Sequence, residues 1–418
     1  MTRWPFLLTL GTCFIASPLR AEALWPEFRG PTAQGHSTAT GLPTEWAPDK
    51  NIVWRIEPPG RGWSSPVVAD GHVFFTYATE VVPDTGIGLH TIALEAATGK
   101  VLWDTEVFRS TDPALLRMHQ KNSHASPTPI IDGSHIYVHF GQHGSACLKD
   151  SGKVVWTSRE HPYVAVHGSG GSPVLVDGVL IYNADAEADP QVIALDKSTG
   201  KTRWVVKRTS NAKKKFSFST PLVIEVIGQK QVITPGSGIV QALNPKDGSE
   251  IWHVTYDQGY SVVPRPIFAH GMIFMSTGYD KPQGLAIKVD AESKGDVTAT
   301  HMVWQETKYV PHNPSMLVVG DELYMLADNG LFSARDAKTN TVYFEERLLG
   351  PSSSSLLYAD GLIYAIDEKG ASAVVKPGKT LEVVAKNELN EKTLASMAVC
   401  DNDLLIRTEK AVYRVGKK

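Results

Sequence analysis

The chain has 418 residues, of which 42% are hydrophobic and 20% are charged, and its formal net charge is −3. This composition excludes a disordered chain, because there are enough apolar side chains to fill a large core. The only dense run of cations is Lys213–Lys215. A phosphate-binding surface needs more clustered cations than this, so we expect no nucleic-acid partner.

The first residues have the pattern of an export signal. Arg3 precedes an apolar stretch over residues 4–16, and residues 21–23 form a small-x-small end, which is typical of a secretory signal peptide. We therefore predict cleavage near Ala23, rather than lipidation at Cys13, and a periplasmic or secreted protein. No later stretch reaches the roughly 18 uninterrupted apolar residues of a transmembrane helix, so no transmembrane segment is predicted.

Tight-turn signals between apolar or aromatic runs recur along the rest of the chain, and each indicates a β-hairpin. Eight of them are found, at Asp70-Gly71, Asp132-Gly133, Asp177-Gly178, Ile227-Gly228, His270-Gly271, Gly320-Asp321, Asp360-Gly361 and Asp401-Asn402. Their average spacing of about 47 residues is the period expected of four-stranded propeller blades.

A second signature, GxxxW, follows a short strand and a polar turn in each early repeat. It places Trp103, Trp156, Trp204 and Trp252 at equivalent positions, and a degenerate copy ends at Trp304. A large ring that recurs once per blade is expected to pack between neighbouring sheets, with its indole N–H on a backbone acceptor. The alternative, a row of ligand-stacking aromatic residues, would require these rings to face a cavity.

The two ends of the chain complement each other. The last repeat provides three strands and stops before a GxxxW strand, whereas Asn51-Ile-Val-Trp54-Arg55 resembles the missing strand. Pairing of the two segments would close the ring and remove two open sheet edges. The sequence therefore predicts an all-β fold, an eight-bladed β-propeller of four-stranded antiparallel blades over residues 51–418, after a signal peptide (1–23) and an N-terminal arm (24–50).

Blade 1 carries two insertions. One, over residues 80–89, lengthens a loop inside the blade. The other, over residues 108–121, contains DPALLRMHQ, for which Asp112 and Pro113 predict a short helix. Long loops on rigid scaffolds tend to carry function, so this helix could lie over the channel mouth, or it could merely pack on the rim.

In a propeller, the residues just before each innermost strand line one mouth of the central channel. Here these eight segments, which we call the approach segments, are rich in Ser, Gly and Pro. The larger side chains among them are the candidate ligand-binding residues: Arg61, Trp63, His119, His124, His167, Tyr260, Arg265, His312 and Asn313. His124, His167 and His312 could converge on the axis and bind a transition metal, although polar lining of the channel is the simpler interpretation, and the sequence assigns no metal site.

The Asp-Gly hairpins and the GxxxW strands after IAL-type strands (IALEAATGKVLW, IALDKSTGKTRW) resemble the pyrroloquinoline-quinone-type propeller repeat family over residues 51–418. The resemblance implies a propeller fold, and the family includes both quinoprotein dehydrogenases and the non-enzymatic outer-membrane-barrel assembly lipoprotein. Residues 25–31 (WPEFRGP) also resemble the leader of exported propellers of planctomycete-type bacteria.

For a quinoprotein dehydrogenase, the resemblance implies adjacent cysteines, a calcium site and an aspartate base. Adjacent cysteines are absent, because Cys147 and Cys400 lie in distant repeats, where we expect them to be buried as small apolar residues. No Asp or Glu aligns with the base or the metal ligands. No cofactor is therefore expected, and pyrroloquinoline quinone with calcium has no support from the residues.

The leading functional hypothesis is an exported, non-catalytic scaffold that binds a protein segment or small molecule of the cell envelope at the channel mouth. The alternative is a quinone-dependent oxidoreductase that acts on alcohols or sugars. No nucleophile motif of the GxSxG type is present. The sequence carries no signal for an oligomeric state.

Overall fold

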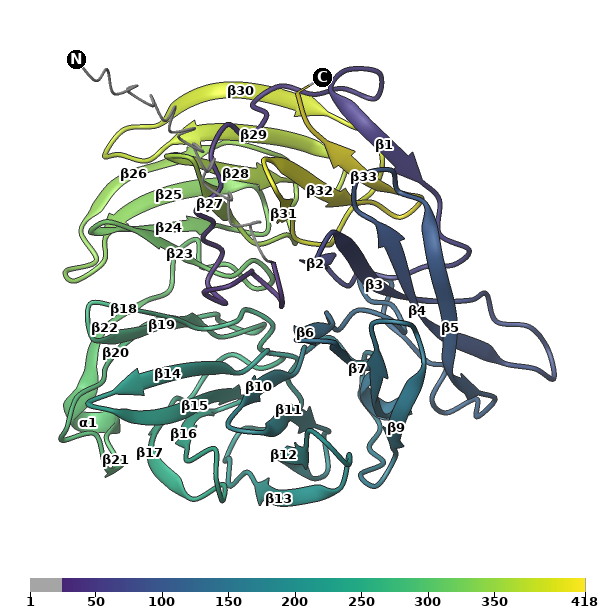
Figure 1. Cartoon of the computed structure of the whole chain (residues 1–418). Helices are drawn as coiled ribbons and strands as arrows, with labels where there is room; N and C mark the ends of the chain where they lie inside the picture. The colour runs from purple at the N-terminus through teal and green to yellow at the C-terminus, as the bar shows by residue number, and fades with distance from the viewer. Residues whose placement is uncertain (1–24, 418) are drawn as a thin grey trace, which may run out of the picture.

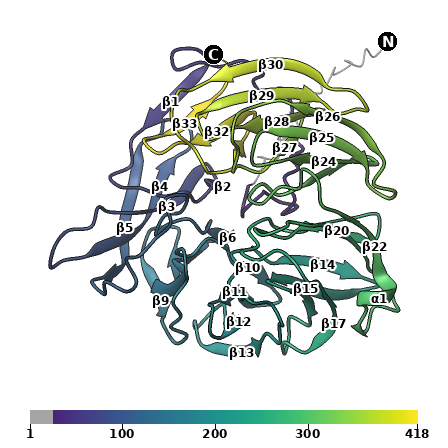
Figure 2. The same ribbon diagram turned by 180° about the vertical axis from the view of Figure 1, so that it is seen from behind.

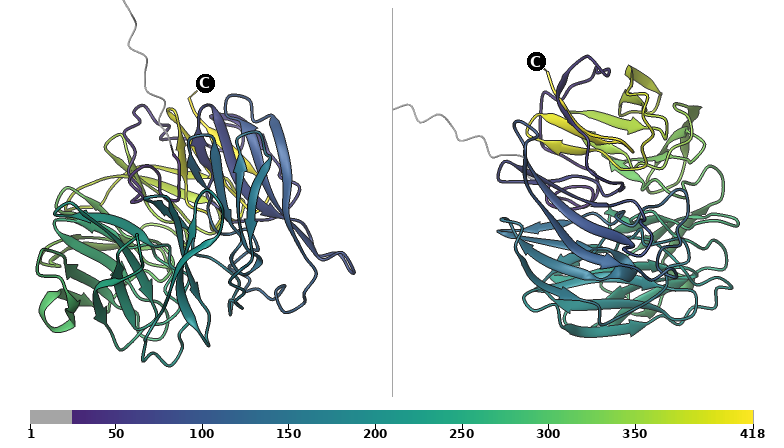
Figure 3. Two further views of the ribbon diagram at one scale, coloured as in Figure 1. Left: turned by 60° about the horizontal axis from the view of Figure 1, so that its bottom comes forward. Right: turned by 90° about the vertical axis from the view of Figure 1, so that its right-hand side faces the viewer.

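The computed structural model describes residues 25–417, so the predicted signal peptide and Cys13 lie outside the described residues. Eight sheets surround a central axis, and each contains four antiparallel strands that run in order from the axis outward (Figure 1). The eight-bladed propeller predicted from the repeats is thereby confirmed. Figure 2 shows the ring from behind, and Figure 3 shows it from two further sides.

The first half of the ring contains blades 1 to 4. Blade 1 comprises β2 (Val67–Ala69), β3 (His72–Ala78), β4 (Ile87–Glu95) and β5 (Val101–Ser110). Blade 2 comprises β6 (Ile130–Asp132), β7 (His135–His139), β8 (Ser145–Lys149) and β9 (Val154–Ser158), with the short 3-10 helix η1 (Gly141–His143) between β7 and β8. Blade 3 comprises β10 (Val174–Val176), β11 (Val179–Asp185), β12 (Pro190–Asp196) and β13 (Thr202–Lys207). Blade 4 comprises β14 (Leu222–Val226), β15 (Gln229–Gly236), β16 (Ile239–Leu243) and β17 (Glu250–Thr255), and β21 (Gly295–Asp296) adds to β17 in parallel.

The second half contains blades 5 to 8. Blade 5 comprises β18 (Ile267–Ala269), β19 (Met272–Ser276), β20 (Gly284–Lys288) and β22 (Met302–Glu306), and the one-turn helix α1 (Thr298–His301) precedes β22. Blade 6 comprises β23 (Leu317–Val319), β24 (Glu322–Leu326), β25 (Leu331–Asp336) and β26 (Val342–Arg347). Blade 7 comprises β27 (Leu357–Ala359), β28 (Leu362–Ile366), β29 (Ala371–Lys376) and β30 (Glu382–Glu388). Blade 8 comprises β31 (Ala398–Cys400), β32 (Asp403–Arg407), β33 (Val412–Val415) and β1 (Ile52–Ile56). No helix of the described residues is long and apolar enough to cross a membrane.

Blade 8 closes the ring as predicted. Strand β1 pairs antiparallel with β33, so that Trp54 lies opposite Arg414 and Ile56 lies opposite Val412. Because the outer strand comes from the start of the chain and the three inner strands come from its end, unfolding of either end exposes an edge of the sheet.

The repeated tryptophans join neighbouring blades. The indole of Trp54 in blade 8 donates to the carbonyl oxygen of Ala96 in blade 1 at 2.7 Å, and Trp103 in blade 1 donates to Asp150 in blade 2 at 2.6 Å. The ring of Trp54 packs on Gly99, where a Cβ would come within 2.9 Å of it. Trp156, Trp204 and Trp304 make the same bond to the next blade. Trp252 instead donates within its own blade, to Gln231. The rings therefore pack between sheets, as predicted, and none of them lines the cavity described below.

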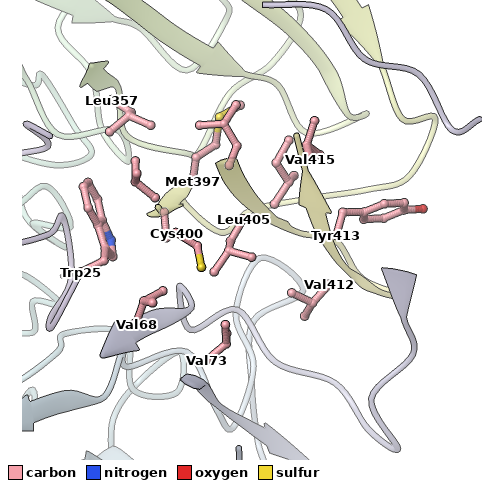
Figure 4. Close-up of a cluster of buried hydrophobic side chains, with 14 of the residues drawn as sticks. Trp25, Val68, Val73, Leu357, Met397, Cys400, Leu405, Val412, Tyr413 and Val415 are labelled. Carbon is pink, nitrogen blue, oxygen red and sulfur yellow. The ribbon is translucent and has the colours of Figure 1, made fainter. Parts of the chain in front are cut away.

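The N-terminal arm enters the middle of the ring, where it lies among β2, β23 and β27 (Figure 1). The backbone of Trp25 pairs with that of Val68 on β2, with N···O distances of 3.0 and 2.8 Å, and Gly35 O accepts from Tyr358 N on β27. Trp25 is 1% exposed and packs with side chains of blades 1, 7 and 8, among them Val68, Leu357 and Leu405 (Figure 4). The arm thus uses backbone groups of the innermost strands that neighbouring blades leave unpaired.

The predicted helix in the blade 1 insertion is wrong. Asp112 caps a single turn, in which its side chain accepts from Ala114 N and its carbonyl accepts from Leu115 N. The chain then continues without helical bonds, because His119 N is directed at the carbonyl oxygen of His167, 3.2 Å away. A contact with blade 3 has replaced the helical bonds that the local sequence favours.

Candidate functional site

A cavity of about 530 Å³ lies on the channel axis, on the side where the chain approaches the innermost strands. Seven of the eight blades contribute a Ser or Thr to its wall, each two residues before the innermost strand begins. These residues are Ser65, Thr128, Ser172, Thr220, Ser315, Ser355 and Ser396. We call this set the hydroxyl belt.

The hydroxyl belt links neighbouring blades. Ser65 N donates to the Thr128 hydroxyl at 3.0 Å, Thr128 N donates to Ser172 at 2.9 Å, and Ser172 N donates to Thr220 at 2.9 Å. The same bond recurs from blade 5 to blade 8, from Arg265 N to Ser315, from Ser315 N to Ser355 and from Ser355 N to Ser396. Each of these hydroxyl oxygens therefore accepts a backbone N–H, and its single proton is left to be donated elsewhere.

Blade 5 interrupts the hydroxyl belt, because Arg265 occupies its position. Arg265 is 2% exposed, and its guanidinium donates to Pro221 O at 2.9 Å, to Phe28 O at 2.6 Å and to the Glu27 carboxylate at 2.9 Å. It therefore holds the arm beneath the cavity, and the ring of Phe28 forms part of the cavity floor. The chain's own N-terminal segment therefore lies across the channel beneath the cavity.

A second buried arginine lies in the arm directly after Phe28. Arg29 is 2% exposed and donates to Met316 O at 2.8 Å, but its Nε and Nη1 have no hydrogen-bond partner among residues 25–417. Burial, and to a smaller extent the charge of Arg265, lower the pKa of Arg29 to about 9. The guanidinium is therefore protonated at neutral pH.

The blade 1 insertion covers part of the cavity mouth. Lys121 extends from it to blade 7, where its Nζ lies 2.7 Å from Glu368 Oε1, and Lys121 and His119 both line the cavity. Burial lowers the pKa of Lys121, but the hydrogen bond to Glu368 and the nearby negative charges, that of Glu368 first, together outweigh burial and leave the pKa above its ordinary value. We call residues 111–122 the strap.

Aromatic rings form one wall of the cavity. His167, Phe218 and Tyr260 line it, and Phe216 packs behind them, with ring centroids 5.3 Å from His167 and 5.5 Å from Tyr260. Burial lowers the pKa of His167, so this wall is uncharged near neutral pH. It offers apolar ring surface opposite the serine-rich blades 6 to 8.

A second hollow of about 410 Å³ adjoins the cavity beside the strap. Trp63, His119 and Asn122 line both spaces. The second hollow also contains Arg61, which is 68% exposed at its side chain and lies 3.1 Å from Glu80. The two hollows therefore adjoin across these three shared side chains.

The structure brings together most of the residues singled out from the sequence. Trp63, His119, His167, Tyr260 and Asn313 line the cavity, and Arg61 and His124 line the second hollow. His312 lies beside the cavity, with its ring centroid 5.0 Å from that of Tyr279, which does line it. Arg265 does not line the cavity, because its guanidinium is turned to the arm.

The three histidines considered for a metal lie in separate contacts. His124 Nδ1 is 3.3 Å from Nε2 of His143, the rings of His119 and His167 are 5.2 Å apart, and His312 packs on Tyr279. Burial lowers the pKa of His124 and of His143 to about 4. Within residues 25–417, no group of three or more His, Cys, Asp or Glu side chains is placed to hold a metal ion.

Sequence reasoning missed Phe28, Lys121, Asn122, Phe218 and Tyr279. Phe218 lies in an approach segment, FSFSTP, and could have been included on that ground. Phe28 lies in the arm, Tyr279 lies in the connection between β19 and β20, and nothing local indicates that either faces the axis.

The cavity does not fit pyrroloquinoline quinone with calcium. This cofactor is a polycarboxylate, and Lys121, already bonded to Glu368, is the only Lys or Arg among the described lining residues. A calcium ion prefers carboxylate and amide oxygens, but no described Asp or Glu lines the cavity. Of the side-chain amide oxygens in the lining, that of Asn122 already accepts from Ser126 and from Ser123 N, which leaves that of Asn313. A calcium ion takes roughly six to eight oxygen ligands, so this one oxygen is too few.

Comparison with solved structures shows the same fold. BamB from Moraxella catarrhalis superposes with a TM-score of 0.63 at 13% sequence identity, over 88% of this chain and 97% of the other. A quinohemoprotein alcohol dehydrogenase from Comamonas testosteroni superposes with a TM-score of 0.66 at 13% identity, over 95% of this chain and 81% of the other. At this identity the likeness concerns the fold alone. A search of curated proteins found no significant match.

A family profile described as outer membrane protein assembly factor BamB matches residues 90–305, slightly more than half of the chain. Blades 2, 3 and 4, nearly all of blade 5 and the two outer strands of blade 1 lie in this range. The chain therefore belongs to this family of pyrroloquinoline-quinone-like β-propellers.

Proposed function

We propose that the protein is an exported, non-catalytic scaffold that holds a protein segment or small molecule of the cell envelope in the cavity at the channel mouth. The observation that carries this proposal is the shape of the channel. The arm lies beneath the cavity, held by the pairing of Trp25 with β2 and by the bond from Arg265 to Phe28 O, so the cavity is a cup that has the arm as its floor. A cup lined by a few polar groups and several aromatic rings is typical of a binding site.

The rim of the mouth supports contact with a partner. Tyr279 is 38% exposed there, and Val164 and Val166 on the approach to blade 3 are 55% and 40% exposed. Exposed aromatic and apolar side chains around a concave site are typical of interaction surfaces. Export is supported by the signal-like residues 1–23, and family membership is consistent with an envelope protein.

Site-specific photo-crosslinking tests the proposal. A photoreactive phenylalanine analogue at Tyr279 should capture an envelope component, whereas the same analogue at Ile227, in a turn on the opposite face and 79% exposed, should not. Val263 lines the cavity and is half-buried, so Val263→Trp fills part of it and should abolish capture at Tyr279. The same products from both positions would contradict the proposal.

The alternative, a quinone-dependent oxidoreductase, has the same fold but not the residues that the cofactor needs. Reconstitution with the quinone and calcium, followed by dye-linked oxidation of alcohols and sugars, separates the two functions. We expect no activity above that of the Val263→Trp variant treated in the same way.

A further inference from the structure

We propose that the cavity binds the C-terminal end of a polypeptide, with the terminal carboxylate at the hydroxyl belt and the preceding residues passing Trp63 into the second hollow. The inference rests on the proposed function, since it assigns a ligand class to the same cup. Three observations support it: among the described residues, the belt hydroxyls donate no hydrogen bond to the protein, the buried charge of Arg29 has no carboxylate partner, and two hollows adjoin at the mouth.

The hydroxyl belt presents hydrogen-bond donors to the cavity. Six of its oxygens accept a backbone N–H, as described above, and within residues 25–417 none of the seven hydroxyls donates a hydrogen bond to another protein group. A hydroxyl has one proton, so the belt has several O–H donors and few free acceptors. Such a set matches a group that only accepts, and a carboxylate makes the stronger, charge-assisted form of this bond.

The charges near the hydroxyl belt also favour a carboxylate ligand. No described Asp or Glu lines the cavity, and the charge of Lys121 at its mouth is already compensated by Glu368. Beneath the floor, Glu27 compensates Arg265, but no described carboxylate forms a salt bridge with Arg29, whose Nε and Nη1 are unpartnered. This excess positive charge is buried, so it is screened less than a surface charge. An amino terminus would meet donors and a like charge, so the structure disfavours that end of a chain.

The shape favours a chain over a compact acid. The two hollows adjoin at Trp63, His119 and Asn122, and we expect a ligand that fills the cup to continue past these side chains. Phe218, Val263 and Leu394 give the cup an apolar side. We therefore expect an apolar or aromatic C-terminal residue, whose carboxylate is bound much as terminal carboxylates are captured in known recognition modes.

Fluorescence anisotropy with defined peptide pools tests this inference. The probes are fluorescein-labelled hexapeptides with five randomised positions and a C-terminal Phe, prepared once with a free carboxylate and once as the amide. We expect the carboxylate pool to bind at least about tenfold more tightly, as charge-assisted hydrogen bonds would provide. Glucuronate and benzoate, as free acids without a chain, should compete only weakly.

Ser65→Ala is the sharpest variant, because the Ser65 hydroxyl neither donates nor accepts a hydrogen bond within the described residues, while its backbone N–H keeps the bond to Thr128. Folding should therefore be unaffected, and affinity for the carboxylate pool should fall about three- to tenfold, with little change for the amide pool. Ser151→Ala, on the exposed turn after β8, is the matched control and should change the affinity for neither peptide pool.

The outcomes separate this inference from the proposed function. Equal binding of both pools, or loss of equal size for both pools in Ser65→Ala, would overturn the carboxylate assignment. Tight binding of glucuronate with no peptide binding would overturn the inference that the ligand is a polypeptide. In either case crosslinking from Tyr279 still tests whether the cup is a binding site. Filling variants Val263→Trp and Leu394→Trp should both abolish peptide binding, and peptide binding retained by both folded variants would also overturn the inference.

Discussion

Lys121 and Glu368 are bonded across the channel mouth: Lys121 Nζ lies 2.7 Å from Glu368 Oε1, although 247 residues separate them in the chain. Glu368 also accepts from the Ser353 hydroxyl at 2.6 Å, so its carboxylate is held in place from blade 7. The strap is bonded to blade 2 through Leu115, to blade 3 through His119 and Asn122, and to blade 7 through Lys121. The Lys121–Glu368 bond therefore fixes the end of the strap that crosses to blade 7.

Glu368→Gln should free the strap from blade 7, and so loosen it, without destabilising the ring. The amide oxygen can still accept from Ser353, but the ionic partner of Lys121 is lost. Because Lys121 and Glu368 are partly exposed, the free energy of unfolding should change by less than about 1 kcal/mol. Trypsin should cleave after Arg117, an exposed residue of the strap, several times faster. Glu382→Gln, which breaks the exposed pair with Lys376, is the control. An unchanged cleavage rate would contradict the role of the Lys121–Glu368 bond.

Arg265→Ser should loosen the arm even though it restores a hydroxyl to the hydroxyl belt. The substitution removes the bonds to Phe28 O and Glu27, and bonds to charged groups contribute about 1.5–3 kcal/mol each. Amide hydrogen exchange in residues 25–37 should accelerate at least about tenfold. Ser172→Ala, which breaks the belt in blade 3 and leaves these arm contacts intact, should leave that exchange unchanged. If both variants accelerate it equally, Arg265 does not hold the arm in particular.

The fold was predictable because its determinants are local and repeated. Asp-Gly turns and GxxxW strands recur at one spacing, and Trp54 in the first strand has the same role as Trp103 in blade 1. The approach segments likewise indicated the correct face for the cavity. The arm and the strap were not predictable in the same way. The hydrogen bond from Arg265 to Phe28 O and the salt bridge between Lys121 and Glu368 join segments that only the closed ring brings together.

His139 should make stability fall in acid. It is 2% exposed, and burial lowers its pKa to about 3. Between this value and its ordinary value of 6.5, the unfolded chain is protonated and the native one is not, so the free energy of unfolding decreases as the pH falls through that range. One proton corresponds to a slope of about 1.4 kcal/mol per pH unit.

Urea unfolding from pH 7 to pH 4 should show a flatter dependence of the free energy of unfolding on pH for His139→Phe. Ser145→Ala removes the 2.8 Å contact with His139 Nδ1 but keeps the imidazole, and it should keep the slope. Parallel profiles for all three proteins would exclude His139 as the cause.

Ile227→Asp should stabilise the protein. Ile227 has a φ of 49° in the hairpin between β14 and β15, where five equivalent turns have Asp or His at similar angles: Asp70, Asp177, His270, Asp360 and Asp401. A β-branched residue is strained in this left-handed conformation, whereas Asp tolerates it. Ile227 is 79% exposed, so its side chain contributes little packing that could be lost.

We expect the free energy of unfolding, measured in urea, to rise by about 0.5–1 kcal/mol. The reciprocal Asp70→Ile, in the corresponding turn of blade 1, should lose a similar amount. Loss of stability in Ile227→Asp would mean that the exposed isoleucine has a packing role that outweighs the strain of its backbone.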